Sequence, residues 1–434
     1  MFERIAIALA VIAATSSPKW CFSAEPLRDE QIKRLREEGP SAVDRLMLQR
    51  AELLAKRDTS SQRPEQAEAE LTALNDAIDQ VARAKYSHLS GLYWYTEEDA
   101  AFAAAKAQKK PVLTLRLLGN LDEEFSCANS RYFRQLLYTH EGIRKLLHDK
   151  FILHWKPVRP VPLITVDLQN GMRLQRTITG NSVHYIVLPD QNIVDVFPGL
   201  YAPDWFLKRL TAAERVAQEA MDSKTPDAVI AEHVSSQQEE IERCWKVDVQ
   251  KYHAFVAAQK PGKENLAVGE IPTPVPDFWK TIGSFHEDLS ELGTTADQLV
   301  KAESKRILDA QAQAFPGGPT MANMRLAMAW AKGRDESTLL HFMRLCLRGD
   351  LAIDTLQNEY GPRYLALTLL NGDSRVDRLN EWIYRSAFGC SPDDPWAGLD
   401  EFTQYAALPK DGGYSAEPKK KSNSLSAVKD QQKK

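Results

Sequence analysis

The sequence KKPVLTLRLLGNLDEEFSCANSRY, residues 109–132, decides the fold that we expect for this chain. Pro111 precedes a short apolar run, Val112–Leu118, whose length and turn-like borders predict a buried strand. The loop Gly119–Ser126 follows it, and a helical pattern begins near Cys127. The stretch therefore predicts a strand, a loop and a helix in that order, with a cysteine at the first turn of the helix.

The flanking segments extend this unit in both directions. Upstream, Glu97–Lys109 is an alanine-rich helical pattern that begins after Thr96 and carries acidic residues in its first turn. Downstream, the apolar spacing and the turn residues predict a helix, a strand, two hairpins and a closing helix, over residues 141–150, 151–155, 164–168 with 172–178, 185–188 with 193–197, and 203–221. Asn170-Gly171 is the strongest of these turn signals.

The local sequence is similar to that of a known family. The run from Glu98 to Leu113, which ends in Lys109-Lys110-Pro111-Val112-Leu113, resembles the entry of exported thioredoxin-like domains, and a cysteine at a helix start follows it. The resemblance covers a little over a quarter of the chain. It implies an α/β thioredoxin-like domain over residues 93–221, with a central mixed sheet flanked by helices, in a chain that is otherwise mainly α-helical.

Two departures from the family pattern bear on activity. Family members with dithiol chemistry carry C-x-x-C, whereas this chain has Cys127-Ala128-Asn129-Ser130, a C-x-x-S. The family also has a cis-proline before its third core strand, and the matching stretch Gly180–Tyr185 contains no proline. In an alternative alignment Cys127 matches the second family cysteine and Glu124 the first. We prefer the first match because Ser130-Arg131 stands where the family has a cysteine and a basic residue.

The candidate catalytic residues are Cys127, Ser130 and His184. Unpaired N–H groups at a helix N-terminus favour a thiolate, so Cys127 is the expected nucleophile and the most reactive thiol. Ser130 could donate a hydrogen bond to the sulfur, Arg131 adds a cation, and His184 could hold or relay a proton. The acidic residues 122–124 oppose thiolate formation. The alternative is that Cys127 is an inert core residue.

The whole chain divides by composition into segments of different character. We expect a signal peptide, a helical hairpin, the thioredoxin-like domain, a long helix, a linker, a helical C-terminal domain and a disordered basic tail, over residues 1–24, 25–90, 93–221, 225–260, 261–276, 277–408 and 409–434. Arg4 and the apolar run after it indicate export, so we expect a periplasmic or secreted bacterial-type protein. The mature chain would then begin near Ser17 or Glu25.

Composition narrows the functional classes further. A formal net charge of −4 argues against a general nucleic-acid binder, which needs a basic field. No segment after the first is apolar for long enough to cross a membrane. Cys244, Cys346 and Cys390 lie on helical patterns, far apart and without C-x-x-C spacing, and we expect them in the core. No phosphate loop, metal-ligand spacing or cofactor motif is present.

Two hypotheses follow from these observations. In the first, the chain is a cell-envelope protein with thiol-dependent redox or thiol-capture activity through Cys127 alone, acting on an unknown thiol or protein partner. In the second, the thioredoxin-like domain is a non-catalytic interaction module or scaffold. The cysteine at a helix start motivates the first hypothesis. The missing second cysteine and cis-proline motivate the second.

Overall fold

The computed structural model of the chain describes residues 26–59, 64–177, 180–259, 275–286, 351–370 and 375–395. Its helical elements, in which η marks a π-helical turn, are α1 (Asp29–Glu37), α2 (Pro40–Thr59), α3 (Pro64–Ala82), α4 (Ser87–Ser90), α5 (Glu98–Gln108), α6 (Ala128–Tyr132), η1 (Phe133–Leu137), α7 (Glu141–Lys150), α8 (Pro203–Asp222), α9 (Pro226–Gln259), α10 (Val275–Gly283), η3 (Glu359–Arg363), α14 (Tyr364–Leu370), α15 (Val376–Trp382) and η4 (Ile383–Ala387). Its strands are β1 (Val112–Leu118), β2 (Ile152–Arg159), β3 (Leu163–Asp167), β4 (Arg173–Thr177), β5 (Ser182–Val187) and β6 (Ile193–Pro198).

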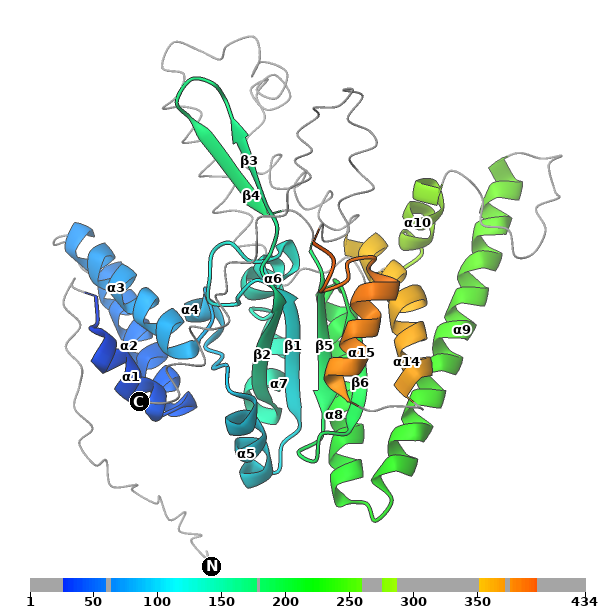
Figure 1. The fold of residues 1–434 in the computed structure, drawn as a ribbon, viewed down its shortest axis with the longest axis horizontal. Coiled ribbons are helices and arrows are strands. Elements are labelled where there is room, and N and C mark those ends of the chain that lie inside the picture. The colour runs from blue at the N-terminus through cyan, green and yellow to red at the C-terminus, as the bar shows by residue number, and fades with distance from the viewer. Residues whose placement is uncertain are drawn as a thin grey trace, which may run out of the picture.

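Four of the strands form one mixed sheet in the order β2-β1-β5-β6 (Figure 1). β1 pairs with β2 in parallel and with β5 in antiparallel orientation, and β6 is antiparallel to β5. The strand that follows Pro111 therefore lies beside the strand that contains Ile186, as the sequence predicted. The molecule is an α/β protein in which helices flank a mixed sheet.

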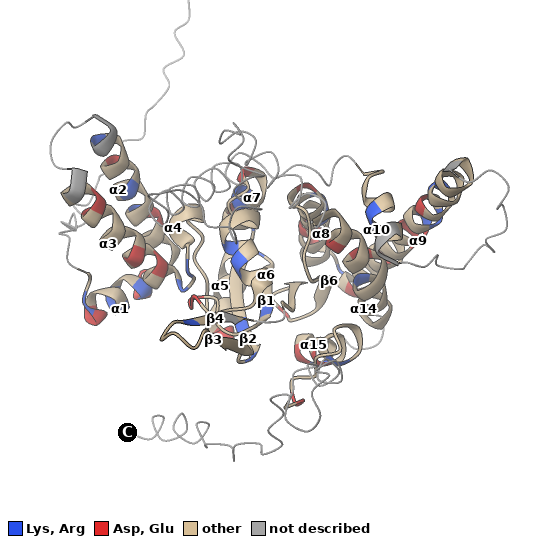
Figure 2. Ribbon diagram, turned by 90° about the horizontal axis from the view of Figure 1, so that it is seen from above, with Lys and Arg blue, Asp and Glu red and all other residues tan. Residues whose placement is uncertain are grey.

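One face of the sheet is covered by α6, α7 and α8, which correspond to helices predicted from the sequence. Leu115 of β1 stands opposite His184 of β5, so their side chains share a face. The His184 ring lies 4.6 Å from the Phe133 ring and 5.2 Å from the Phe206 ring. Viewed from above, α6, α7 and α8 lie on this side and α15 lies on the other (Figure 2). The helix that begins after Cys127 thus packs on the sheet, as predicted.

The opposite face of the sheet is contacted by α5 and by the C-terminal helix α15. Arg116 interrupts the apolar run of β1, is buried, and pairs with Glu98 of α5 and Asp377 of α15. The Tyr185 hydroxyl on β5 donates to Asn380 at 3.2 Å. One buried hydrophobic cluster includes residues from the strands and from 352–384. The described part of the expected C-terminal domain, 277–408, therefore shares the core of the sheet.

The remaining two strands form a separate hairpin. β3 and β4 pair with each other in an antiparallel two-stranded sheet, around the turn that Asn170-Gly171 predicted. The hairpin stands away from the four-stranded sheet in Figure 1. It occupies the stretch of chain between β2 and β5.

The N-terminal segment contains more helices than the hairpin expected for 25–90. α2 and α3 are the predicted pair, but α1 precedes them and α4 follows. Gly39, with a φ of +70°, allows the sharp turn between α1 and α2. α1, α2 and α3 bury a small core of their own, which includes Leu35, Leu46 and Ile78.

Several expectations fall outside the described residues. The signal peptide at 1–24, the basic tail at 409–434 and Cys346 lie there entirely. Of the expected linker 261–276, only the last two residues are described, and they begin α10. Cys390 is described and follows η4, so it does not lie within a helix as expected.

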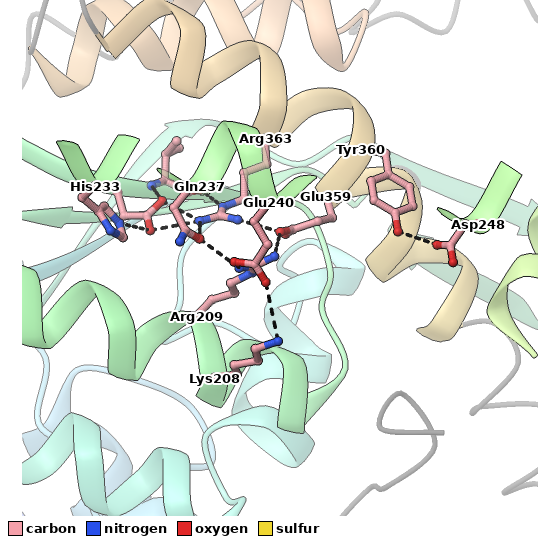
Figure 3. Close-up of polar contacts among 11 residues, drawn as sticks. Lys208, Arg209, His233, Gln237, Glu240, Asp248, Glu359, Tyr360 and Arg363 are labelled. Carbon is pink, nitrogen blue, oxygen red and sulfur yellow. Dashed lines mark hydrogen bonds and ion pairs between the residues drawn. The ribbon is translucent and has the colours of Figure 1, made fainter. Parts of the chain in front are cut away.

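A buried ionic cluster joins the C-terminal elements to the sheet (Figure 3). Two arginine guanidinium groups lie at its centre. Arg363 of η3 donates through Nη2 to both oxygens of Asp195 on β6 at 3.0 Å, and Arg209 of α8 contacts Glu359 at 2.6 Å. Arg363 also donates from Nη1 to Glu359 at 2.6 Å. Asp195, Glu359 and Arg363 are fully buried.

The polar side chains of α9 complete this cluster. His233 Nε2 lies 2.9 Å from Asp195 Oδ2, and Gln237 Oε1 accepts from Arg209 and Arg363. Burial by itself would raise the pKa of Asp195, but the Arg363 guanidinium and the hydrogen bond with His233 outweigh burial and hold this pKa at about 2. The cluster therefore favours the ionised carboxylate.

We predict that Asp195→Asn lowers the free energy of unfolding at neutral pH by about 3–5 kcal/mol, because it leaves Arg363 buried without its main counter-ion. The native pKa of Asp195 lies below its usual value of 3.8, so its contribution is present above about pH 4 and is lost as pH falls towards about pH 2. Urea denaturation between pH 2 and pH 7 tests both statements.

The matched control is Asp167→Asn, which breaks the exposed ion pair with Arg173. It should cost less than about 1 kcal/mol at neutral pH. Equal losses in the two variants would show that the buried cluster does not stabilise the fold in the way argued.

Candidate functional site

Cys127 stands at the start of a helix, the position predicted for it. It is the N-cap of α6, reached from β1 through the loop 119–126, and its Sγ accepts a hydrogen bond from the Ser130 backbone N–H at 3.3 Å. The cysteine thus satisfies one of the unpaired donors at the start of the helix. Its side chain, however, has no exposure to solvent.

Burial decides the protonation state of this thiol. Desolvation raises the pKa of Cys127, and the hydrogen bonds from Ser130 and the cation of Arg134 lower it by less. The cation that lowers this pKa is Arg134, whereas the sequence analysis named Arg131. The thiol therefore stays protonated at neutral pH, which disfavours nucleophilic attack.

Ser130 lowers the pKa of Cys127 through both its backbone and its side chain, although by less than burial raises it. Its hydroxyl lies 2.6 Å from Ser126 Oγ and 2.8 Å from the Cys127 carbonyl oxygen. Arg134 binds the same group of atoms, because it donates to Ser126 Oγ and to the carbonyl oxygens of Leu121 and Glu123. Ser130 and Arg134 therefore fix the loop before the helix, and their lowering of the Cys127 pKa is smaller than the rise caused by burial.

His184 lies on β5 beneath the helices, inside an aromatic enclosure. Its Nε2 is 2.7 Å from the Tyr138 hydroxyl, and its Nδ1 is buried with no hydrogen-bond partner. Burial lowers the pKa of His184 to about 3, so the imidazole is neutral over the physiological range. A neutral histidine can donate one hydrogen bond and accept one, but it cannot supply a positive charge to a thiolate.

Tyr138 lies near both Cys127 and His184, and the sequence analysis did not name it as a site residue. Burial raises the pKa of the Tyr138 hydroxyl, and the nearby Cys127 raises it further. Tyr138 therefore lies within electrostatic range of Cys127 and in direct contact with His184. The signal that could have found it is its place near the end of the helical segment that begins at Cys127.

Side chains from two other parts of the chain lie against residues 180–182, before and at the start of β5, and form a cover there. The Asn129 side chain donates to Ser182 Oγ at 3.1 Å, and an added Cβ at Gly180 would lie 2.7 Å from Asn129 Oδ1. The Tyr384 hydroxyl, from the C-terminal segment, donates to the Asn181 carbonyl at 3.0 Å. Gly180 therefore permits a close approach that helps to close this end of the sheet.

Tyr384, which belongs to this cover, lies near Cys390 as well as Cys127. Burial raises the pKa of Tyr384, and both Cys127 and Cys390 raise it further. Cys127, Cys244 and Cys390 are nevertheless all free thiols, and no disulfide joins them. Ser130 provides no thiol, so the described residues offer no C-x-x-C pair.

The described residues also line a cavity with charged walls. A shallow cavity of about 380 Å³ lies between α5 and α15, but its Glu98 and Asp377 carboxylates already pair with Arg116 and Lys156. Within the described part of the chain, no group of three or more His, Cys, Asp or Glu side chains could hold a metal ion. No described helix combines the length and the apolar character needed to cross a bilayer.

We predict that His184→Gln flattens the pH dependence of stability between about pH 6.5 and pH 4. The native pKa of His184 lies below its unfolded value, so the unfolded chain binds the extra proton and stability falls as pH decreases through this window. In this window the free energy of unfolding of the variant should fall less steeply than that of the wild type, by up to about 1.4 kcal/mol per pH unit. Urea denaturation at four pH values measures this slope.

His148→Gln is the control with the opposite sign. Hydrogen bonding to Asp149 raises the pKa of His148, with Asp44 adding to the effect, so its contribution is lost as pH rises. In His148→Gln, the fall of stability between about pH 6.5 and pH 4 should therefore be as steep as in the wild type or steeper. A wild-type slope that persists in His184→Gln would contradict the buried, neutral state.

Comparison with protein-family models, curated proteins and solved structures found nothing similar to this chain. The geometry around Cys127 and the arrangement of the elements therefore carry the functional argument. That geometry is a cysteine that caps a helix, is sealed from solvent and is held in its protonated form.

Proposed function

We propose that this chain is a cell-envelope protein whose thioredoxin-like domain acts as a non-catalytic interaction module or scaffold. One observation carries the proposal: among the described cysteines, the one that stands at a helix start, Cys127, is fully buried, and burial raises the pKa of its thiol. A nucleophilic thiol must be ionised and reachable by its substrate. Cys127 meets neither condition in this conformation.

The arrangement of the elements supports the thioredoxin-like part of the proposal. β1 and β2 are parallel, a helix with a cysteine at its start lies between them, and the antiparallel pair β5–β6 is followed by α8. This is the order of helix, strand, cysteine helix, strand, antiparallel hairpin and helix that the resemblance implied. The β3–β4 hairpin is an addition between β2 and β5.

The non-catalytic part rests on what surrounds the thiol. Dithiol exchange needs a second sulfur to release the mixed disulfide, and Ser130 replaces that sulfur. The proton relay expected of His184 is directed to Tyr138, and the histidine is held neutral. Contacts from Asn129 and Tyr384 close the approach through 180–182.

Thiol capture by Cys127 is the second candidate function, and one contact favours it. The Ser130 N–H donates to Sγ and would stabilise a thiolate once the sulfur reached solvent. This function requires the cover formed by Asn129 and Tyr384 to open. Measured reactivity of the thiol in the native chain therefore separates the two functions.

Site-resolved alkylation tests the proposal. We expect iodoacetamide at pH 8 to modify Cys244, which is only partly buried, before Cys127, as read by mass spectrometry of the cysteine peptides. Cys127 should react only at the rate of unfolding, because its burial must first be lost. A wild-type chain in urea provides the fully reactive reference.

Cys127→Ser is the matched variant, because serine keeps an acceptor at the N-cap. It should fold and retain any binding activity of the native chain. Fast modification of Cys127 in the native protein, or loss of partner binding in a folded Cys127→Ser, would overturn the non-catalytic proposal in favour of thiol capture.

A further inference from the structure

The turn that joins β3 to β4 carries Asn170-Gly171 at the tip of the hairpin, away from the four-stranded sheet (Figure 1). The Leu168 backbone N–H donates to the Met172 carbonyl oxygen at 3.0 Å and closes the turn. Asn170 and Gly171 are both exposed. Water therefore reaches the Asn170 side chain and the peptide bond that follows it.

The Asn170 side chain is bent forward along the chain. Its Oδ1 accepts a hydrogen bond from the Met172 backbone N–H at 3.0 Å. This is an Asx turn, in which the side-chain carbonyl spans the residue that follows the asparagine. That residue is Gly171, so the turn holds Cγ of Asn170 on the side of the Gly171 nitrogen. The same hydrogen bond withdraws electron density from Cγ and makes this carbon a better electrophile.

Gly171 leaves the approach to its own nitrogen open. Its φ is +88°, and a Cβ added here would meet nothing within 4 Å. Glycine has no side chain that could shield its backbone nitrogen. Among the described residues, none accepts a hydrogen bond from the Gly171 N–H. The nitrogen is therefore an unhindered nucleophile once its proton is removed.

We propose that Asn170 is a site of spontaneous modification, at which water converts the side-chain amide into a carboxylate through a cyclic imide. The Gly171 N–H loses its proton, the nitrogen bonds to Cγ of Asn170, and the Cγ–Nδ2 bond breaks. Ammonia leaves with the proton. One water then adds to either carbonyl carbon of the ring and opens it to aspartate or isoaspartate. One water is consumed, one ammonia is released, and nothing is oxidised or reduced.

The turn between β5 and β6 provides a comparison within the same chain. The Leu188 N–H donates to the Asn192 carbonyl oxygen at 2.8 Å and closes that turn. Asn192 is followed by Ile193, which begins β6 and is only 2% exposed. The branched Ile193 side chain hinders attack by its own backbone nitrogen. An asparagine in a hairpin turn is therefore not sufficient, and the proposal applies to Asn170 because glycine follows it.

The modification would change both the charge and the geometry of the hairpin tip. Asp167 lies close by, since its Oδ1 accepts the Gln169 N–H at 2.9 Å and its other oxygen pairs with Arg173. Isoaspartate also adds one carbon to the backbone path, and turn geometry sets the register of a hairpin. We expect the pairing of β3 with β4 to loosen. The four-stranded sheet does not include these strands and should keep its structure.

Peptide mapping by mass spectrometry tests the proposal on the purified full chain, incubated folded at about pH 8 and sampled over time. Asn170 should be converted at least about tenfold faster than Asn192, which corresponds to a barrier lower by about 1.4 kcal/mol. A second Asn-Gly pair, at 371–372, lies outside the described residues, and its peptide is scored separately.

Two variants separate the parts of the argument. Asn170→Gln keeps the amide but requires a larger ring, so the turn should stay unmodified over the same time. Asn170→Asp adds the charge without the extra backbone carbon. Hydrogen exchange over residues 163–177 should be faster in the isoaspartate fraction of the aged wild type than in fresh Asn170→Asp. Circular dichroism shows whether the rest of the fold is retained.

Three results would overturn the proposal. The first is an Asn170 that stays intact in the folded chain while a free peptide of residues 167–173 is converted. The second is conversion of Asn170 and Asn192 at equal rates. The third is conversion of Asn170 only after the chain is unfolded in urea. None of these results depends on Cys127, so the proposed function is judged separately by alkylation.

Discussion

The buried ion pair between Arg363 and Asp195 is the constraint on which the rest of the structure depends. Both side chains are fully buried, and each is the main charged partner of the other, with Glu359 and His233 as further partners. The pair fixes η3 against β6, and the segments that follow η3 then cover one face of the sheet. Tyr384 and its contact with Asn181 belong to the same C-terminal part. The closed surroundings of Cys127 are thus tied to a contact on the far edge of the sheet.

Local features of the fold could be predicted from the sequence because local interactions determine them. The apolar run of β1, the turns around Asn170-Gly171 and Gln191, and the periodicity of α8 and α9 each need only neighbouring residues. The position of Cys127 at a helix start belongs to the same class. The pairing of β1 with β5 was also expected, because the order of elements implied by the family resemblance places these strands together.

The features that the sequence did not predict depend on distant contacts. Arg363 meets Asp195 across 168 residues, and nothing near either residue indicates its partner. Arg116 looks like an interruption of an apolar strand until Asp377 is placed beside it. Arg134 is different, since it lies seven residues after Cys127 and thus two helical turns along the same side. That spacing could have indicated the cation that acts on the thiol.

The character of Cys127 follows from two opposing effects of unequal size. A helix N-terminus stabilises a negative charge by about 0.3–1 kcal/mol at an exposed site and by up to about 2 kcal/mol in a partly buried one. Removing an ion from water costs several kcal/mol even after the protein has relaxed. Burial therefore prevails, and the pKa of the thiol rises although Sγ accepts an N–H from Ser130. A cysteine at a helix start indicates reactivity only if solvent reaches it, and here contacts from another part of the chain decide that access.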